Sequence, residues 1–259
     1  MHLSQVAAQL YTVRDFCKTA PDLAQTLRKL RAIGYEAVQL SGVGPIPEAE
    51  IVKMLVGEGL TLCATHENAQ TILDQPQAVV EKLKKLNCRY TAYPYPAGFK
   101  FGSMEEVDTL CTKLNAAGKL LHENGQVLTY HNHDIEFLKV AGKTVMEHIF
   151  ERTAPAFLQG EPDTFWVQIG GNDPAAWCRR LAGRLPLLHL KDYKPVLDQR
   201  AQMAEIGNGV LDWPKIIAEA EASGCEWFIV EQDAFWMDND PFRSLEISFA
   251  YIREKLACR

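Results

Sequence analysis

The feature that most constrains the fold of this chain is an alternation that recurs eight times. A short apolar or β-branched run is followed each time by a longer amphipathic segment, which is typical of parallel strands connected by helices. The apolar runs lie at residues 6–11, 35–42, 60–66, 89–95, 126–133, 157–163, 185–192 and 227–233. The amphipathic segments lie at residues 22–34, 47–59, 76–87, 104–125, 145–154, 173–183, 213–224 and 241–256.

Glycines and prolines mark the boundaries of these segments. Five glycines stand just after an amphipathic segment, where a left-handed cap residue belongs: Gly34, Gly59, Gly125, Gly183 and Gly224. Four prolines stand near expected helix starts, where a missing N–H costs nothing: Pro47, Pro174, Pro214 and Pro241. Because this pattern continues along the whole chain, we expect one domain spanning residues 1–259. No G-x-G-x-x-G or P-loop motif follows a strand, which favours a closed (β/α)8 TIM barrel over an open doubly wound sheet.

Composition excludes several classes of partner. The chain has 259 residues, a formal net charge of -6 and no block of Lys and Arg, which argues against a nucleic-acid partner and for a small molecule. Its 7 cysteines are scattered without a C-x-x-C pair, as expected for reduced thiols in a cytoplasmic protein. We expect no secretion signal and no membrane span, because no apolar run approaches about 18 residues. The sequence does not decide whether the protein forms a homo-oligomer.

Four apolar runs in the second half of the chain end on, or just before, a metal-ligand residue. In a barrel of parallel strands the carboxyl ends of the strands meet at one face and carry the chemistry. The four residues are His131, Asp163, His189 and Glu231. Glu136 follows closely behind the first, so we predict that one divalent ion is held by Asp163, His189 and Glu231. Either Glu136 or His131 supplies the fourth ligand.

Two further choices concern the same site. Glu161 lies two residues before Asp163 and shares its face of the strand, but Asp163 is nearer the strand exit and is the preferred ligand. Asp163 could also serve only as a helix cap or turn residue. A mixed set of imidazoles and carboxylates suits Mn²⁺, Co²⁺, Zn²⁺ or Fe²⁺, and suits Mg²⁺ less well because Mg²⁺ prefers oxygen ligands.

Several motifs resemble those of the xylose isomerase-like TIM barrels, the sugar phosphate isomerase/epimerase group. They are QLYTVRD, CATH, YHNHDIEF, DTFWVQIGGNDP, HLKDY, IGNGVLDW and VEQD. In that family a Glu, an Asp, a His and a second Glu hold one divalent metal at the ends of strands five to eight. The resemblance assigns three of these positions to Asp163, His189 and Glu231. This chain departs from the family pattern at the first ligand position, where His131 stands in place of the Glu that many relatives carry.

The resemblance implies a metal-dependent isomerase or epimerase of a keto-sugar that works by proton transfer through a metal-stabilised enediolate. Glu231 is the expected base, and Glu136 is the partner on the opposite face of the substrate. The expected catalytic residues are Glu231, Glu136, His131 and Lys191. Those expected to contact the substrate are His66, His133, Trp166, Tyr11 and Phe235, with Phe165 and Trp236 as further aromatic candidates.

Other outcomes use the same scaffold. If a leaving group lies β to the abstracted proton, the same site would make the protein a keto-sugar or inosose dehydratase or lyase. A sugar-binding barrel without catalysis is the alternative from another class. A DNA-repair endonuclease of the endonuclease IV type is disfavoured, because it would need a larger His-rich zinc site and a basic groove.

Overall fold

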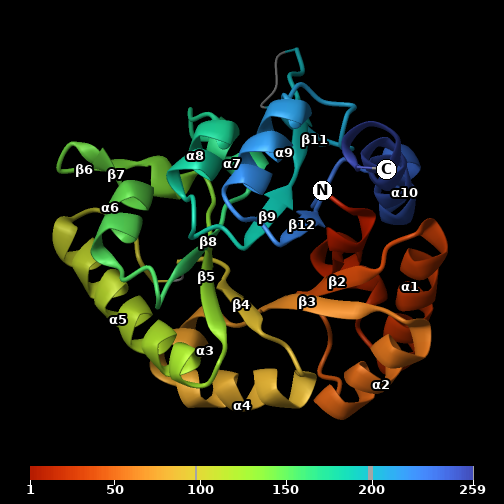
Figure 1. Cartoon of the computed structure of the whole chain (residues 1–259), viewed down its shortest axis with the longest axis horizontal. Coiled ribbons are helices and arrows are strands. Elements are labelled where there is room, and N and C mark those ends of the chain that lie inside the picture. The colour runs from red at the N-terminus through yellow and green to blue at the C-terminus, as the bar shows by residue number, and fades with distance from the viewer. Residues whose placement is uncertain (97, 198–200, 259) are drawn as a thin grey trace.

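A computed structural model describes residues 1–96, 98–197 and 201–258, and it confirms the predicted (β/α)8 barrel (Figure 1). Eight strands form one sheet in the order β8-β5-β4-β3-β2-β1-β12-β9, and every neighbouring pair in it is parallel. The strands are β1 (Val6–Gln9), β2 (Ala37–Leu40), β3 (Thr61–His66), β4 (Tyr90–Tyr93), β5 (Val127–His131), β8 (Gln159–Glu161), β9 (Leu187–Leu190) and β12 (Trp227–Val230).

The two edge strands of this sheet, β8 and β9, close the barrel at the level of the predicted metal ligands. Asp163 and His189 form an isolated parallel bridge. The His189 N–H donates to the Pro162 carbonyl at 3.0 Å, and the Gly160 N–H donates to the Arg184 carbonyl at 2.8 Å. The closure is therefore local, and it places two of the candidate ligands on adjacent strands.

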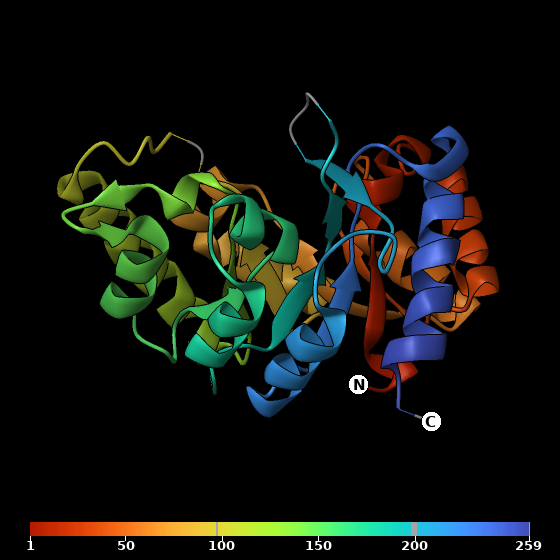
Figure 2. The same cartoon turned by 90° about the horizontal axis from the view of Figure 1, so that it is seen from above.

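Helices surround the strands in the order that the sequence predicted (Figures 1 and 2). The eight that match predicted segments are α1 (Ala20–Ile33), α2 (Glu48–Glu58), α4 (Pro76–Leu86), α5 (Met104–Glu123), α6 (Val145–Arg152), α8 (Pro174–Arg180), α9 (Trp213–Ala222) and α10 (Pro241–Tyr251). All five predicted stop glycines have positive φ. Gly59, at φ 64°, caps α2 in the left-handed conformation that residues with a side chain adopt only at a cost.

The structure also contains elements that the periodicity did not predict. Two short helices are α3 (Ala69–Asp74) and α7 (Thr164–Ile169), and two antiparallel hairpins pair β6 (Lys139–Val140) with β7 (Lys143–Thr144) and β10 (Asp192–Lys194) with β11 (Gln202–Ala204). Four 3-10 segments, η1 to η4, span Leu3–Gln5, Leu10–Phe16, Ile135–Phe137 and Met237–Asn239, and a π-helical turn, η5, spans Ile252–Leu256. Within the described residues no helix is both long and apolar enough to cross a bilayer.

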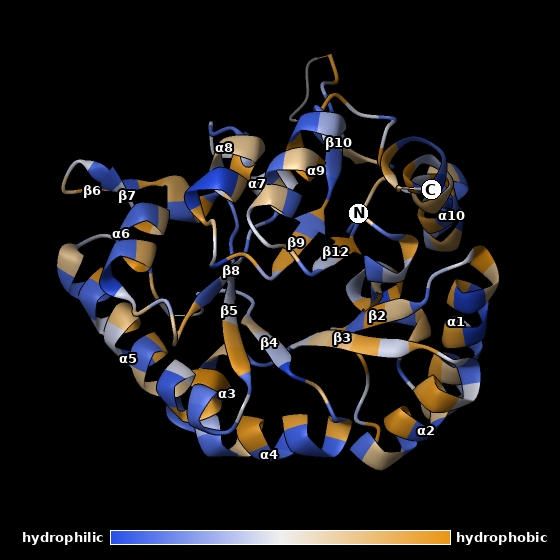
Figure 3. Cartoon of the chain, in the orientation of Figure 1, coloured by the Kyte–Doolittle hydropathy of each residue, from blue (hydrophilic) through white to orange (hydrophobic). Residues whose placement is uncertain are grey.

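Burial divides the molecule into an outer apolar shell and a barrel interior. The shell packs the outward faces of the strands against the helices, whose hydrophobic sides turn inward (Figure 3). A separate apolar cluster comprises Ala7, Ala37, Cys63, Ala64, Tyr90, Leu187 and Ile229. Because strand side chains alternate between faces, residues two positions further along share the interior. Two positions on from Ala7, Ala37, Leu187 and Ile229 stand buried polar residues, namely Gln9, Gln39, His189 and Glu231. The barrel interior is thus apolar toward the amino ends of the strands and polar toward their carboxyl ends.

Candidate active site

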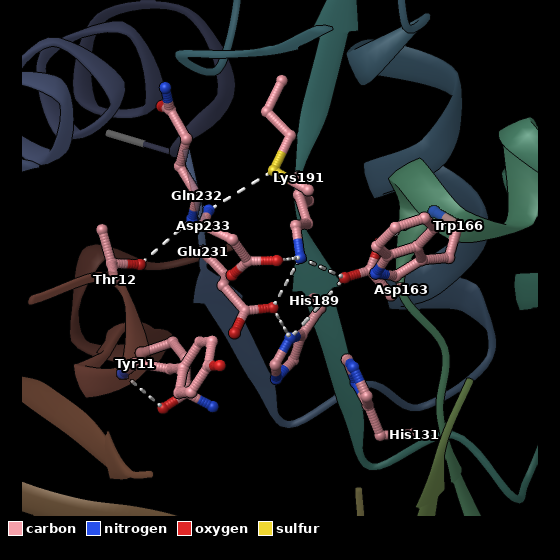
Figure 4. Close-up of polar contacts among 12 residues, drawn as sticks. Tyr11, Thr12, His131, Asp163, Trp166, His189, Lys191, Glu231, Gln232 and Asp233 are labelled. Atoms are coloured by element: carbon pink, nitrogen blue, oxygen red, sulfur yellow. Dashed lines mark hydrogen bonds and ion pairs between the residues drawn. The ribbon is translucent and has the colours of Figure 1, made fainter. Parts of the chain in front are cut away.

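Four of the predicted side chains converge at the carboxyl ends of four neighbouring strands. Donor atoms of His131, Asp163, His189 and Glu231 lie within 4.8 Å of one another, and all four residues are buried. Nδ1 of His189 lies 3.0 Å from Oε2 of Glu231 and 3.9 Å from Oδ2 of Asp163. The His131 and His189 rings are 4.5 Å apart between centroids. Figure 4 shows Asp163 and Glu231 reaching this point from opposite sides of His189.

Asp163 serves as a helix cap and as a candidate ligand at once. Its Oδ1 accepts the Trp166 N–H at 3.0 Å, which caps α7. Its Oδ2 is buried and has no hydrogen-bond partner among the residues that the structure describes, and the same holds for Nδ1 of His131. Buried polar atoms are rarely left unpaired, because each loses its hydration on burial. The two unpaired atoms are therefore consistent with a bound cation.

Lys191 brings a buried positive charge to the same point (Figure 4). Its Nζ lies 3.1 Å from Oε2 of Glu231, 3.5 Å from Oδ2 of Asp163 and 2.5 Å from Oδ2 of Asp233. Burial would lower the pKa of Lys191, but the three carboxylates outweigh it and hold the pKa above its usual value. Lys191 is therefore a permanent cation beside the predicted ligands.

Mutual electrostatics also shift the pKa of the candidate ligands. Burial raises the pKa of Asp163 to about 6, with Lys191 opposing this shift. Burial would raise the pKa of Glu231 as well, but Lys191 and His189 hold it well below its usual range. For His189, burial would lower the pKa, yet Glu231 and Glu161 raise it to about 10. The site favours positive charge at its centre, which a metal ion could supply in place of a proton.

A second group of donor atoms lies deeper in the barrel. Oε1 of Glu161 lies 2.6 Å from Nε2 of His66 and 2.8 Å from Nε2 of His189. Gln39 donates to the same oxygen at 3.0 Å, and Thr129 donates to Oε2 at 3.0 Å. Donor atoms of His66, His131, Glu161 and His189 all lie within 4.8 Å of one another. Two donor groups therefore share His131 and His189.

The structure does not bring Glu136 to the predicted metal ligands. Its carboxylate is fully buried and accepts the Tyr130 hydroxyl at 2.9 Å and the His133 N–H at 2.8 Å. Tyr130 neighbours His131 on β5 and so points to the outer face of the barrel, drawing Glu136 away from the interior. Burial raises the pKa of Glu136 to about 7. Of the two candidates for the fourth ligand, the geometry places His131 with the other three.

A cavity of about 460 Å³ opens above the candidate ligands, a size suited to a small molecule. Tyr11, His66 and His133 line it, as the sequence predicted, and so do Lys191 and Glu231. Burial and the charge of Lys191 lower the pKa of His133 to about 4. Tyr11 is stacked by the Arg14 guanidinium at 4.5 Å from its ring centroid.

Two predicted substrate contacts lie beside this cavity instead of lining it. Trp166 and Phe235 belong to a neighbouring pocket that Phe165 also lines. The Trp166 ring lies 5.3 Å from that of His133, and Lys191 Nζ lies 5.5 Å from the Trp166 ring. This neighbouring pocket therefore adjoins the cavity through Trp166. Trp236 lines neither pocket and donates its indole N–H to the Gln232 carbonyl at 2.8 Å.

Sequence reasoning missed several residues that the structure places at the site. They are Glu161, which was set aside in favour of Asp163, and Gln39, Thr129 and Asp233. The spacing of two residues had already marked Glu161 as a competitor of Asp163, and the same spacing relates Asp233 to Glu231. Gln39 and Thr129 carried no comparable signal, because a single amide or hydroxyl in an apolar run has many structural roles.

The residues present fit a divalent cation. Four carboxylates face two positive charges, those of Lys191 and protonated His189, around the point where the donor atoms meet. The carboxylates are those of Glu161, Asp163, Glu231 and Asp233. Uncompensated buried carboxylates are costly, so added positive charge would stabilise the cluster. Two imidazoles and two carboxylates form a suitable donor set for a divalent transition metal.

Known proteins share both this fold and its sequence pattern. Residues 27–255 match the xylose isomerase-like TIM barrel family. The chain belongs to this family. An inosose dehydratase from Bacillus cereus (strain AH820) is 25% identical over 168 residues, which are 58% of this chain and 55% of that protein. The chain thus spans about half the length of the curated relatives it matches.

Solved structures of xylose isomerase-like and related barrels share the fold over nearly the whole chain. A sugar phosphate isomerase/epimerase from Parabacteroides distasonis superposes with a TM-score of 0.84 at 20% identity, covering 99% of this chain and 96% of that one. An L-ribulose 3-epimerase superposes with a TM-score of 0.76 at 15% identity, covering 96% of this chain and 93% of that one. At these identities the likeness establishes the architecture and leaves the reaction to be inferred from the site.

Proposed function

We propose that this protein is a divalent-metal-dependent enzyme that transfers a proton at the carbon next to the carbonyl of a keto-sugar, as an isomerase or epimerase. The observation that carries the proposal is the convergence of His131, Asp163, His189 and Glu231 beneath a cavity of sugar size. Nδ1 of His131 and Oδ2 of Asp163, which lack a hydrogen bond among the described residues, also support it. Membership of the xylose isomerase-like family agrees with this reading.

We further propose that these four residues hold the ion and that it is Mn²⁺, Co²⁺, Zn²⁺ or Fe²⁺. Imidazole nitrogens suit these ions, whereas Mg²⁺ favours an all-oxygen environment. When bound, the ion would act as a Lewis acid on the substrate carbonyl and so acidify the adjacent C–H.

Glu231 is the proposed base. Its Oε2 is engaged by His189 and Lys191, at 3.0 and 3.1 Å. Its Oε1 has no hydrogen-bond partner among the described residues, and the side chain lines the cavity. Because Lys191 and His189 orient the carboxylate, Oε1 is positioned to accept a proton from a substrate carbon.

Other residues around the cavity would bind the sugar. Lys191 would stabilise negative charge that develops on substrate oxygen, because it is a buried cation at the cavity floor. His66 and His133 would hydrogen-bond hydroxyl groups, and Tyr11 would cover an apolar face of the ring. The proposed ligand is therefore a small carbohydrate.

Dehydration of a keto-sugar or inosose is the second candidate function. The predicted opposite-face carboxylate, Glu136, faces away from the cavity, which weakens the case for inversion by two carboxylates. Glu67 does line the cavity, but it is paired with Lys82 at 2.8 Å. Elimination needs one base and a protonated leaving group, and curated relatives named inosose dehydratase agree with this outcome.

One experiment separates these functions from a sugar-binding barrel without catalysis. The metal-loaded protein is incubated in deuterated buffer with a panel of keto-sugars and inososes, and the products are analysed by mass spectrometry. Deuterium incorporation without loss of water supports an isomerase or epimerase. Loss of water supports the dehydratase. A protein that binds metal and sugar but yields neither signal would contradict both catalytic functions.

The identity of the fourth ligand gives a second test. We expect His131→Ala to lose metal, because it removes a donor atom from the group, and Glu136→Ala to retain a full equivalent. Metal content would be measured by inductively coupled plasma mass spectrometry after exhaustive dialysis. The opposite pattern would show that Glu136 rearranges to bind the ion.

A further inference from the structure

Glu161 occupies the centre of the polar interior, and no step of the proposed reaction uses it. Its side chain is fully buried. Its Oε1 contacts His66, Gln39 and His189 at 2.6, 3.0 and 2.8 Å, and its Oε2 accepts the Thr129 hydroxyl at 3.0 Å. A buried carboxylate with four partners is held in one orientation.

These contacts require a hydrogen on Nε2 of His189. Nε2 lies 2.8 Å from Oε1 of Glu161 and 2.7 Å from Oε1 of Gln39. The amide of Gln39 is itself oriented, because its nitrogen donates to Glu161 and its oxygen accepts from Gln9 at 2.6 Å. Both neighbours of Nε2 are therefore acceptors, so Nε2 is the donor. Nδ1 is left facing Glu231 and Asp163.

We propose that Glu161 is a positioning residue that accepts a hydrogen bond from Nε2 of His189, fixes the orientation of the ring and so presents Nδ1 to the divalent ion. This inference rests on the proposed ligand set of His131, Asp163, His189 and Glu231. Carboxylates that accept from the far nitrogen of a ligating histidine fix the ring orientation and raise its basicity as a ligand. The deeper donor group thus supports the ion without holding it.

The hydrogen bonds favour this role over direct ligation by Glu161. Oε1 of Glu161 already has three polar partners. One of them is Nε2 of His66, so that nitrogen is not available as a ligand either. An ion among these atoms would displace several hydrogen bonds. In the outer group, by contrast, an ion would displace the hydrogen bond between His189 and Glu231, but Oδ2 of Asp163 and Nδ1 of His131 have no hydrogen bond among the described residues. The outer group is therefore the better cation site.

Two substitutions of Glu161 test the role, with Thr91→Val as the control. Glu161→Ala removes the carboxylate acceptor from His189 and leaves only the amide oxygen of Gln39, at 2.7 Å from Nε2. It should weaken Zn²⁺ binding by about 10–100-fold while a full equivalent still binds at saturation. Glu161→Gln keeps an oxygen acceptor and should recover part of this loss. Thr91 is buried in a hydrogen bond with Thr65 at 2.9 Å, and its side chain contacts neither Glu161 nor His189. Its replacement should leave the affinity unchanged.

Affinities would be measured by competition with a chelator. The hydrogen on Nε2 of His189 would be observed directly by NMR of Zn²⁺-loaded protein labelled with ¹⁵N-histidine. A protected Nε2–H signal from His189 is expected in the wild type and in Glu161→Gln. In Glu161→Ala, where Gln39 alone accepts, the same N–H should exchange faster with solvent. An unchanged affinity and an unchanged signal in Glu161→Ala would overturn the positioning role alone. Complete metal loss in both Glu161 variants, with metal retained by Asp163→Asn, would overturn the outer ligand set as well.

Discussion

Glu231→Gln is expected to reduce deuterium exchange into substrate by about 10²–10⁴-fold, the range that a positioned general base contributes. The amide occupies nearly the same volume as the carboxylate, so the fold should be retained. It has no basic oxygen, however, and cannot accept a proton from carbon. Exchange would be measured at saturating metal, because the substitution also weakens a ligand, and circular dichroism would verify the fold.

Glu226→Gln is the matched control for Glu231. Glu226 directly precedes β12, is exposed, and accepts the Tyr90 hydroxyl at 2.8 Å. It lines neither the cavity nor the pocket beside it, so its neutralisation should leave exchange unchanged. Wild-type exchange in Glu231→Gln with metal bound would exclude Glu231 as the base.

Lys191→Met is expected to destabilise the metal-free protein by about 3–5 kcal/mol, the cost of removing one partner from a buried ion pair. Methionine fills similar volume but leaves Asp163, Glu231 and Asp233 facing one another without the cation between them. Unfolding by urea, monitored by circular dichroism with a chelator present, would measure the loss. Added divalent metal should restore part of it, because the ion replaces the missing positive charge.

Lys215→Met removes an exposed ion pair and provides the comparison. Lys215 lies 2.7 Å from Asp173, and both side chains are about half exposed. Solvent screens such pairs, so this substitution should cost less than about 1 kcal/mol. Equal stability of the Lys191 and Lys215 variants would indicate that the buried carboxylates take up protons in the metal-free protein and do not need the lysine.

The barrel was predictable because its signals are local and repeated. Apolar runs and amphipathic segments have different periods, and glycines mark their ends, so all eight strands and eight helices could be located. Seven of the eight predicted strands were too long at their carboxyl ends, the exception being the run that ends at His66 with β3. The run at 185–192, for example, contains β9 at Leu187–Leu190, because Lys191 and Asp192 leave the sheet. The short helix α7 was missed because its start is a cap by Asp163, which the sequence presents equally well as a ligand.

The candidate site was predictable where residue type and strand position agreed. Asp163, His189 and Glu231 are metal-ligand types at strand ends, and the structure brings them together. The choice between His131 and Glu136 depended on side-chain direction after the strand. Tyr130 and the His133 backbone hold Glu136 outside the interior, and no pattern of residue types indicates such contacts.

The proposed metal centre is tested most directly by a crystal structure of the Mn²⁺-loaded protein, with anomalous scattering used to locate the ion. We expect a single anomalous peak bonded to His131, Asp163, His189 and Glu231, with Glu161 hydrogen-bonded to Nε2 of His189. A peak bonded to Glu161 and His66 instead, or no peak at this end of the barrel, would contradict the proposed ligand set.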